Sequence, residues 1–523
     1  MKIRFKYIYI FAFIFVFENV FSQIQNWAQW ESAARPTYTA GTAGTGERAY
    51  AVSVSPVDNS VYTVGTYNAT NLTANFNLAH TSTGDGFIVK HNSAGVFQWS
   101  RKIGSATATS EIIYGVDVDP SGNVYVIGQF GGTVDFDPSA ATYNLATAGG
   151  TDIFLAKYSS AGNFLWAVRA GGGNNDIGYE VKADGNAVYI TGNYNAAGAA
   201  FTSFGSATVV NLTSAGGNSE IFCAKYSTAG VVQWAAKAGS SNNDTGYDIT
   251  TDGSNVFLIG EYYNAFTIYN SSNVNSGSLT NQGTSGDVAI ISYNSTGGFN
   301  WATNISSNSI DYGRGICTDG TNLYVTGGVR TNANFKHPTP DYTTTSSSGN
   351  DAFIASIEIV SGVFNWAKTI PGSGTLEYGT AIAYHPAGRI FITGQFNSNI
   401  NFTSLGGTNF NSSTGIDVFA AAFTTNGNFY FANRAGSTST DIGWAIDVDD
   451  NGDAVVSGEI GSNSSFPPIT AQSGVAAANI FTAKLGCGVV MPIPNAGNDQ
   501  TVCSTTATMA ATAATVGVGT WTI

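Results

Sequence analysis

The stretch DTGYDITTDGSNVFLIGEYYNAF at residues 244–266, followed after a polar loop by GDVAIISYNSTGGFNWA at residues 286–302, is the most informative part of this sequence. It contains four short apolar or alternating segments separated by Asp-Gly and similar turn residues, a pattern that indicates four β-strands. The segment NVFLIG at residues 255–260 is apolar at successive positions, which favours a strand covered on both faces. We therefore interpret the stretch as one four-stranded unit.

This unit recurs seven times along the chain. The glycines that end the second strand are spaced 63 to 68 residues apart, at Gly65, Gly128, Gly192, Gly260, Gly327, Gly394 and Gly458. The aliphatic residues that anchor the first strand keep the same step, at Val52, Val116, Val181, Ile249, Ile316, Ile382 and Ile446. Two markers that keep a common period over most of the chain predict a repeat architecture.

Four strands per unit, with inner strands covered on both faces, predict an all-β fold, a seven-bladed β-propeller with four-stranded blades. The seventh unit ends after its third strand, at residues 479–485, and lacks a Trp-containing fourth strand. The segment Asn26-Trp27-Ala28-Gln29-Trp30 precedes the first unit and belongs to none. We expect residues of about 26–31 to close the ring as the outer strand of the last blade, pairing near Phe481.

The N-terminus has the features of an export signal. Lys2, Arg4 and Lys6 precede an apolar run of eleven residues, and small residues before Gln23 predict cleavage after residue 22. Eleven apolar residues are too few to span a bilayer. The formal net charge of -14 argues against nucleic acid or an anionic membrane as a partner. We expect residues 1–22 to be a signal peptide and the chain to be secreted or at the cell surface, without spanning the membrane.

The repeated motifs GYDIxxD, NVxxxG, a D-x-F-x-x-K-Y type strand and NxxWA resemble the SBBP-type β-propeller repeats of secreted Bacteroidetes proteins. The resemblance implies a propeller over residues 23–486 and carries no catalytic motif. The run from Met491 to Ile523, with AGNDQTVC and a later GTW, is similar to the opening of PKD-like or immunoglobulin-like modules. It implies a linker at residues 487–494, an incomplete β-sandwich-like module at residues 495–523, and a longer polypeptide.

One acidic residue stands five positions before the strand anchor in every unit. The set is Glu47, Glu111, Asp176, Asp244, Asp311, Glu377 and Asp441. A ring of carboxylates would attract a cation such as Ca²⁺. A feature repeated in every unit is better explained by backbone hydrogen bonds at each turn, and we favour this structural role. The four histidines occupy unrelated positions in the repeat, so we predict no catalytic, cofactor or metal site.

The loop between the second and third strands differs most between units, and function often resides in variable loops. Its aromatic residues are expected to face a ligand, with packing against the outer blades as the alternative. They include Phe204, Tyr262, Tyr263 and Phe266.

These features together predict a non-enzymatic recognition, adhesion or display module, a monomeric propeller within a larger extracellular protein. Its partner would be an extracellular protein or a glycan. The alternative is an exported polysaccharide hydrolase or lyase that uses the acidic face of the propeller. Converging carboxylates and aromatics in a deep asymmetric pocket would favour the enzyme, whereas a filled, symmetric channel would favour the module.

Overall fold

The computed structural model describes residues 29–34, 37–38, 47–67, 71–73, 78–79, 84–104, 111–195, 198–214, 218–282, 285–330, 332–336, 342–344, 349–412, 414–461 and 479–486. The expected signal peptide, Trp27, the linker and the C-terminal module lie outside these residues. Within them, no helix is long and apolar enough to cross a membrane. The one helical element described is a 3-10 turn, η1 (Thr403–Leu405).

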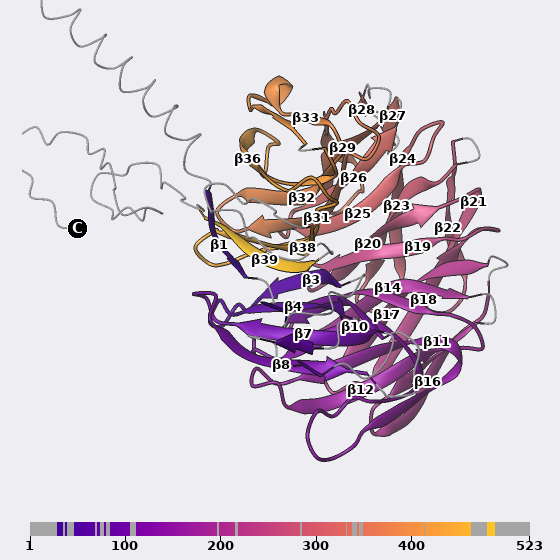
Figure 1. The fold of residues 1–523 in the computed structure, drawn as a ribbon. Helices are drawn as coiled ribbons and strands as arrows, with labels where there is room; N and C mark the ends of the chain where they lie inside the picture. The colour runs from indigo at the N-terminus through magenta and orange to yellow at the C-terminus, as the bar shows by residue number, and fades with distance from the viewer. Residues whose placement is uncertain are drawn as a thin grey trace, which may run out of the picture.

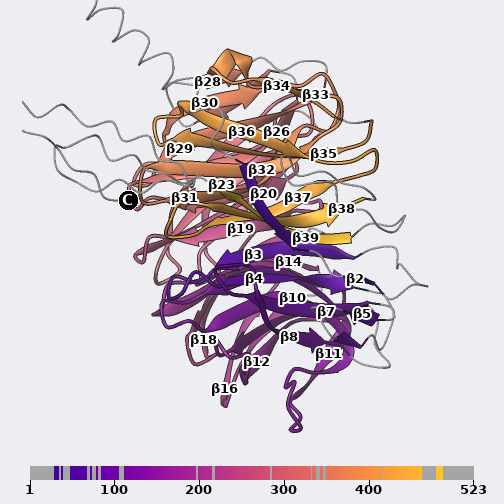
Figure 2. The same cartoon turned by 60° about the vertical axis from the view of Figure 1, so that its left-hand side comes forward.

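Seven antiparallel sheets are arranged around a common centre, as Figures 1 and 2 show. Blade 1 contains β3 (Arg48–Val54), β4 (Val61–Tyr67), β7 (Asp85–His91) and β8 (Phe97–Ile103). Blade 2 contains β9 (Ile112–Val118), β10 (Val124–Asp135), β11 (Asn144–Tyr158) and β12 (Phe164–Gly171). Blade 3 contains β13 (Ile177–Ala183), β14 (Ala187–Asn195), β17 (Ser219–Ser227) and β18 (Val232–Gly239). Blade 4 contains β19 (Thr245–Thr251), β20 (Asn255–Tyr262), β23 (Asp287–Asn294) and β24 (Phe299–Ser306).

The remaining blades follow the same order. Blade 5 contains β25 (Tyr312–Thr318), β26 (Asn322–Arg330), β29 (Asn350–Glu358) and β30 (Phe364–Ile370). Blade 6 contains β31 (Tyr378–His385), β32 (Arg389–Phe396), β35 (Asp417–Thr424) and β36 (Phe429–Ala435). Blade 7 contains β37 (Ile442–Val448), β38 (Ala454–Ile460), β39 (Asn479–Gly486) and β1 (Gln29–Ala34). The predicted seven-bladed propeller is therefore confirmed.

The N-terminal strand β1 closes the ring. It pairs antiparallel with β39, from Gln29 opposite Gly486 to Ala34 opposite Thr482. Figure 1 shows the two strands side by side, although they come from opposite ends of the propeller. The described strand extends three residues beyond the predicted end at residue 31, because the ladder with β39 continues through Ala34, and residues 26–28 lie outside the described part of the chain. Closure leaves neither end of the ring as a free sheet.

Each blade has the four predicted strands, and the sheets of blades 2, 3 and 4 gain two further strands, which makes six in each. The variable loop of each following blade folds into a hairpin that pairs with the outer strand of the blade before it. The three hairpins are β15 (Ala199–Ser203) with β16 (Ser206–Leu212) on β12, β21 (Ala265–Tyr269) with β22 (Asn275–Thr280) on β18, and β27 (Ala333–Lys336) with β28 (Tyr342–Thr344) on β24. An exposed edge strand is a template for unwanted pairing, and these hairpins cover it.

Two smaller sheets complete the described strands. One combines β2 (Thr37–Tyr38), β5 (Asn71–Thr73) and β6 (Leu78–Ala79), and Figure 2 shows β2 beside β5. The other pairs β33 (Asn399–Asn401) with β34 (Asn409–Asn411), and a bridge from Ile400 to Gly372 brings it against the end of blade 5.

The apolar core lies between neighbouring blades. Side chains from facing strands form clusters such as the one that joins Tyr125 and Ile127 of blade 2 to Phe222 and Ala224 of blade 3. This arrangement explains why the second and third strands of each unit are apolar on both faces: each face packs against a different neighbour.

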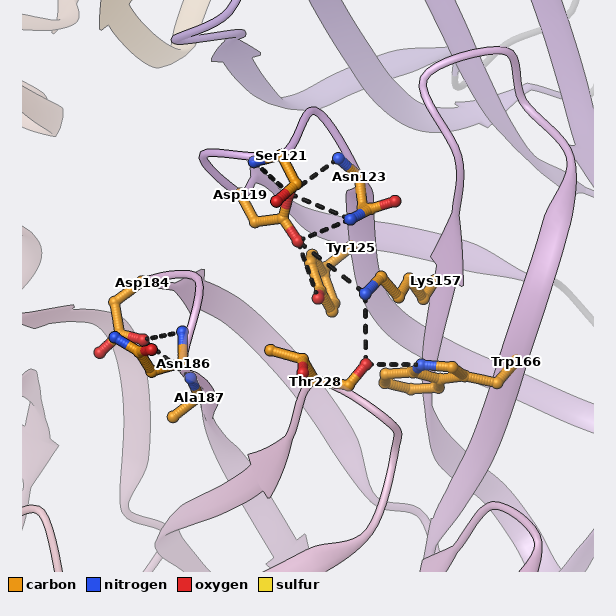
Figure 3. Close-up of polar contacts among 10 residues, drawn as sticks. All are labelled: Asp119, Ser121, Asn123, Tyr125, Lys157, Trp166, Asp184, Asn186, Ala187 and Thr228. Atoms are coloured by element: carbon orange, nitrogen blue, oxygen red, sulfur yellow. Dashed lines mark hydrogen bonds and ion pairs between the residues drawn. The ribbon is translucent and has the colours of Figure 1, made fainter.

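A repeated clasp joins the outer strands of five blades to the next blade, and Figure 3 shows one example. The indole nitrogen of Trp166 donates to the carbonyl oxygen of Thr228 in blade 3 at 3.1 Å, and Lys157 Nζ donates to the same oxygen at 3.2 Å. Gly230 adopts a positive φ of 80° in this turn, and a Cβ there would lie 2.9 Å from Trp166 Cδ2. The indole therefore packs against a turn that only glycine fits.

The same indole bond recurs in four other blades. The donor and acceptor pairs are Trp99 with Ser160, Trp234 with Ser295, Trp301 with Ile359 and Trp366 with Thr425, at 3.0 to 3.1 Å. The recurring tryptophans thus hold blades together.

Removing residues 23–34 should lower the melting temperature sharply compared with a chain that begins at Gln23. The deletion removes β1 and exposes the edge of β39, so the ring loses the strand that joins its two ends. Thermal unfolding followed by circular dichroism measures the effect. An unchanged melting temperature would contradict ring closure by β1.

Replacing Trp166 by alanine should cost about 3 to 5 kcal/mol of unfolding free energy, because a large buried ring is lost from a blade junction. Trp166→Phe keeps an aromatic ring but loses the hydrogen bond to Thr228 and part of the ring area. Loss of the hydrogen bond should lower the unfolding free energy by about 1 kcal/mol, in addition to the effect of the smaller ring. Chemical denaturation of both variants gives the comparison. Equal losses in the two variants would show that the hydrogen bond, and not the ring, dominates the clasp.

Candidate functional site: the central channel and its collar

The seven repeated acids are buried at the junctions between blades. None is more than 1 % exposed. In Asp244, one carboxylate oxygen accepts the backbone N–H of Ser240 at 2.6 Å, and the other accepts the N–H of Tyr263 at 2.9 Å and the hydroxyl of Ser240 at 3.0 Å. The backbone N–H of Asp244 donates to Ser219 of the preceding blade at 3.0 Å. One residue thus joins the loop before β19, the end of β20 and the neighbouring blade.

Some other members of the set repeat these bonds, whereas both carboxylate oxygens of Glu47 and of Glu111 lack a hydrogen-bond partner within the described residues. Asp176 accepts the N–H groups of Gly172 and Asn195 at 2.7 and 2.8 Å, and Asp441 accepts those of Ser437 and Gly461 at 2.7 Å each. The donors to these carboxylates are backbone N–H groups of nearby loops. This geometry agrees with a structural role at the turns. Within the described residues, no group of three or more His, Cys, Asp or Glu side chains is placed to hold a metal ion.

Burial dominates the acid–base behaviour of this set. It raises the pKa of Asp244 from 3.8 to about 7, although the N–H groups of Tyr263 and Ser240 act in the opposite direction. It likewise raises the pKa of Asp311 to about 8 and that of Glu377 to about 7. The protonated form of these groups is therefore favoured by the folded chain.

A cavity of about 280 Å³ lies in the central channel and is lined by the inner strands of all seven blades. Its wall differs from blade to blade. Glu180 and Asp248 precede their strand anchors in blades 3 and 4, where the other blades carry alanine or glycine. Asp117, Lys182 and Asp447 follow their anchors in blades 2, 3 and 7. The channel is neither filled nor symmetric, and four carboxylates face one lysine.

Each aspartate of the channel also joins two inner strands. Asp117 accepts the N–H of Ala183 at 2.7 Å, and Asp248 accepts that of Ile316 at 2.7 Å. Asp447 accepts the N–H of Val54 at 2.7 Å across the closing junction of the ring. The aspartates are therefore held rigidly by the next blade.

The charges of the channel interact strongly. Lys182 Nζ lies 2.9 Å from Asp117 Oδ1. Burial, followed by the charge of Asp248, raises the pKa of Glu180 well above its ordinary value. Burial raises the pKa of Asp248 to about 7 despite two backbone donors. Although burial alone would lower the pKa of Lys182, the carboxylates around it raise that pKa instead.

The residues that come one or two positions before the cavity lining on the inner strands form a ring of mostly aromatic side chains, which we call the collar. Its members stand three positions after the repeated acid, and they are Tyr50, Tyr114, Tyr179, Tyr247, Arg314, Thr380 and Trp444. In every blade the ladder between the first two strands is interrupted at this residue. A β-bulge leaves the extra residue unpaired and re-aims its side chain.

Neighbouring collar rings touch. The centroid distances are 6.0 Å from Trp444 to Tyr50, 5.0 Å from Tyr50 to Tyr114, 5.1 Å from Tyr114 to Tyr179 and 5.3 Å from Tyr179 to Tyr247. The guanidinium of Arg314 lies 3.8 Å from the centroid of the Tyr247 ring and pairs with Glu261 at 2.9 Å. The collar therefore accommodates a cation within its aromatic ring.

Three of the four loop aromatics expected to face a ligand are packed instead. Tyr262 and Phe266 are fully buried, with ring centroids 4.8 Å apart. Phe204 is half-buried against the ring of Tyr143, and its N–H bonds Gly230. Tyr262 is the last residue of β20, and Phe266 lies on the hairpin strand β21; both rings belong to the apolar cluster between blades 3 and 4. Tyr263 alone of the four lines a cavity, of about 240 Å³, near the collar.

The channel residues were not predicted from the sequence, because the repeat pattern identifies positions that all units share and these residues differ between units. The signal that reveals them is the opposite one: a charged residue beside the strand anchor where other units have Ala, Gly, Ser or Thr. Glu180 and Asp248 are such exceptions.

Comparison with known proteins supports the repeat. The family model for the SBBP β-propeller repeat matches residues 98–129. An uncharacterized WD repeat-containing protein, L264, of Acanthamoeba polyphaga mimivirus is 28% identical over 120 residues, which is 21% of this chain and 8% of that protein.

Solved structures with low sequence identity resemble the chain over most of its length. BamB from Moraxella catarrhalis has 11% identity and a TM-score of 0.37, covering 88% of this chain and all of that one (100%). The Dos1 propeller has 8% identity and a TM-score of 0.39, covering 88% of this chain and 96% of that one. By its own sheet order the chain is a seven-bladed β-propeller, and its residues 98–129 match the SBBP repeat.

The chain should melt at a lower temperature at pH 8 than at pH 5. A carboxyl group whose pKa is higher in the folded state binds more protons there, so stability falls as the pH rises between the unfolded and folded values. For Asp244 this window runs from 3.8 to about 7. Calorimetric melting at the two pH values measures the difference.

The variant Asp244→Asn carries no charge at this junction and should show a smaller fall between the two pH values. Asp252→Asn, which changes an acid in the β19–β20 turn of the same blade, is the matched control and should fall as steeply as the parent. A parent that melts higher at pH 8 than at pH 5 would contradict the prediction.

Proposed function

We propose that this chain is a secreted or cell-surface recognition module that does not catalyse a reaction. The observation that carries the proposal is the contrast between scaffold and channel. The acids at the junctions and the outer tryptophans recur from blade to blade, whereas the channel wall and the collar differ between blades. Residues that all blades share are explained by the fold, and a fold by itself does not specify a function. Residues that break the repeat need a local reason, and recognition of a partner supplies one.

The export signal expected at residues 1–22 supports an extracellular partner. The aromatic collar supports a partner whose surface is that of a protein or a glycan. Tyrosine and tryptophan present large, rigid and amphipathic surfaces that lose little conformational entropy on binding. Binding sites also occur preferentially where a fold leaves a concave surface with a few polar groups. The collar and the channel below it have both properties.

The open, asymmetric channel with its four carboxylates meets the criterion given above for the enzyme, so it favours a second candidate, an exported polysaccharide hydrolase or lyase. Glu180 and Asp248 lie in the wall of the same cavity, and the pKa of each is raised. A pair of carboxyl groups with different protonation states is the requirement of glycoside hydrolysis. The buried junction acids do not contribute to this candidate, because their side chains are not exposed.

A screen of the full chain against arrayed glycans and extracellular proteins tests the proposal. We expect binding without turnover, and Tyr179→Ala in the collar should weaken it, whereas Trp99→Phe on the outer strand should not. Release of reducing ends from a polysaccharide, abolished by Glu180→Gln, would overturn the proposal in favour of the enzyme. Absence of any binding partner in the screen would overturn it as well.

A further inference from the structure

The cavity of about 240 Å³ beside the collar is confined to blade 4. It is lined by Asn242 and Asn243 from the loop before β19, by Thr245 and Tyr247 on β19, and by Glu261 and Tyr263 at the end of β20. Tyr263 stands three positions after the strand glycine, where the other six units carry Gly, Asn or Arg. The cavity therefore depends on a side chain that breaks the repeat.

Tyr263 is held in place by the scaffold. Its backbone N–H donates to the carboxylate of Asp244 at 2.9 Å. Its ring lies over Gly286, where a Cβ would come within 2.9 Å of Tyr263 Cζ. The adjacent Asn264 bonds Ser241 at 3.2 Å and so connects the two loops that form the rim. Sites held in this way lose little freedom when a ligand binds.

The charges in this cavity are balanced. Glu261 is only 6 % exposed, and its carboxylate is paired with Arg314 at 2.9 Å. Arg314 in turn covers the face of Tyr247. A cationic ligand would have to displace a cation already paired, and an anionic ligand would approach a buried carboxylate. The remaining surface is aromatic, hydroxyl and amide in character, with the amides of Asn242 and Asn243 on exposed residues.

We propose that this cavity binds one neutral sugar ring of an extracellular glycan. An aromatic face packs against the apolar face of a pyranose, and amide and carboxylate oxygens accept its hydroxyl protons. The volume equals that of about eight water molecules in the liquid, which is enough for one sugar ring and too small for two. The inference rests on the recognition role proposed above and assigns that role a ligand class and a place.

Titration of the full chain with the methyl glycosides of glucose, galactose and mannose tests the inference by calorimetry and saturation-transfer NMR. We expect a neutral glycoside to bind in the millimolar range. Tyr263→Ala and Asn242→Ala should each weaken binding by about tenfold or more, the loss of one good contact. Tyr263→Phe keeps the ring and should bind within a few-fold of the parent.

Asn174→Ala is the matched control, because Asn174 occupies in blade 3 the repeat position of Asn242 and does not line the cavity. It should bind like the parent. Binding that survives both Tyr263→Ala and Asn242→Ala, or a preference for glucosamine over the neutral glycosides, would overturn the inference. If no glycoside binds but the chain captures a protein, the inference fails and the recognition role stands; if nothing binds, both fail.

Discussion

The buried carboxylate at each blade junction is the constraint on which the rest of this propeller depends. An unpaired buried polar group is costly, and five of the seven carboxyl groups accept hydrogen bonds. Those of Glu47 and Glu111 have no hydrogen-bond partner among the described residues. Asp244 has donors from two loops, while its backbone N–H reaches the preceding blade. The start of the inner strand, the end of the second strand and the neighbouring blade are thereby placed together.

Two kinds of junction, at opposite ends of the strands, hold neighbouring blades together, and the Trp clasp occurs at five of the seven. The acids act where the inner strand begins, and the Trp clasp acts at the opposite turns, where Thr228 receives both Trp166 and Lys157. With both ends held, the side chains between them are free to vary without loss of the ring. The channel residues Glu180 and Asp248 use this freedom.

The variable loops of blades 3, 4 and 5 protect the outer edges of the blades before them. By pairing with the outer strand of the preceding blade, β15, β21 and β27 cover edges that would otherwise be exposed. The cost is that their aromatics, such as Phe266, are buried and unavailable to a ligand. This burial is the reason why the proposed recognition site lies at the collar and at the cavity beside Tyr263, and not at the loop tips.

Local patterns in the sequence were sufficient to predict the blade count and the closing strand, because strand period, turn chemistry and recurrence are properties of the chain itself. Hairpin pairing across blades could not be predicted, since it depends on which outer edge each loop reaches. The channel cluster and the collar also required the tertiary structure. Tyr50 and Tyr114 are 64 residues apart, and only the ring brings their centroids to 5.0 Å. The sequence alone determined the repeat. Only the closed ring decided which residues that differ between units, such as Glu180 and Asp248, lie next to one another.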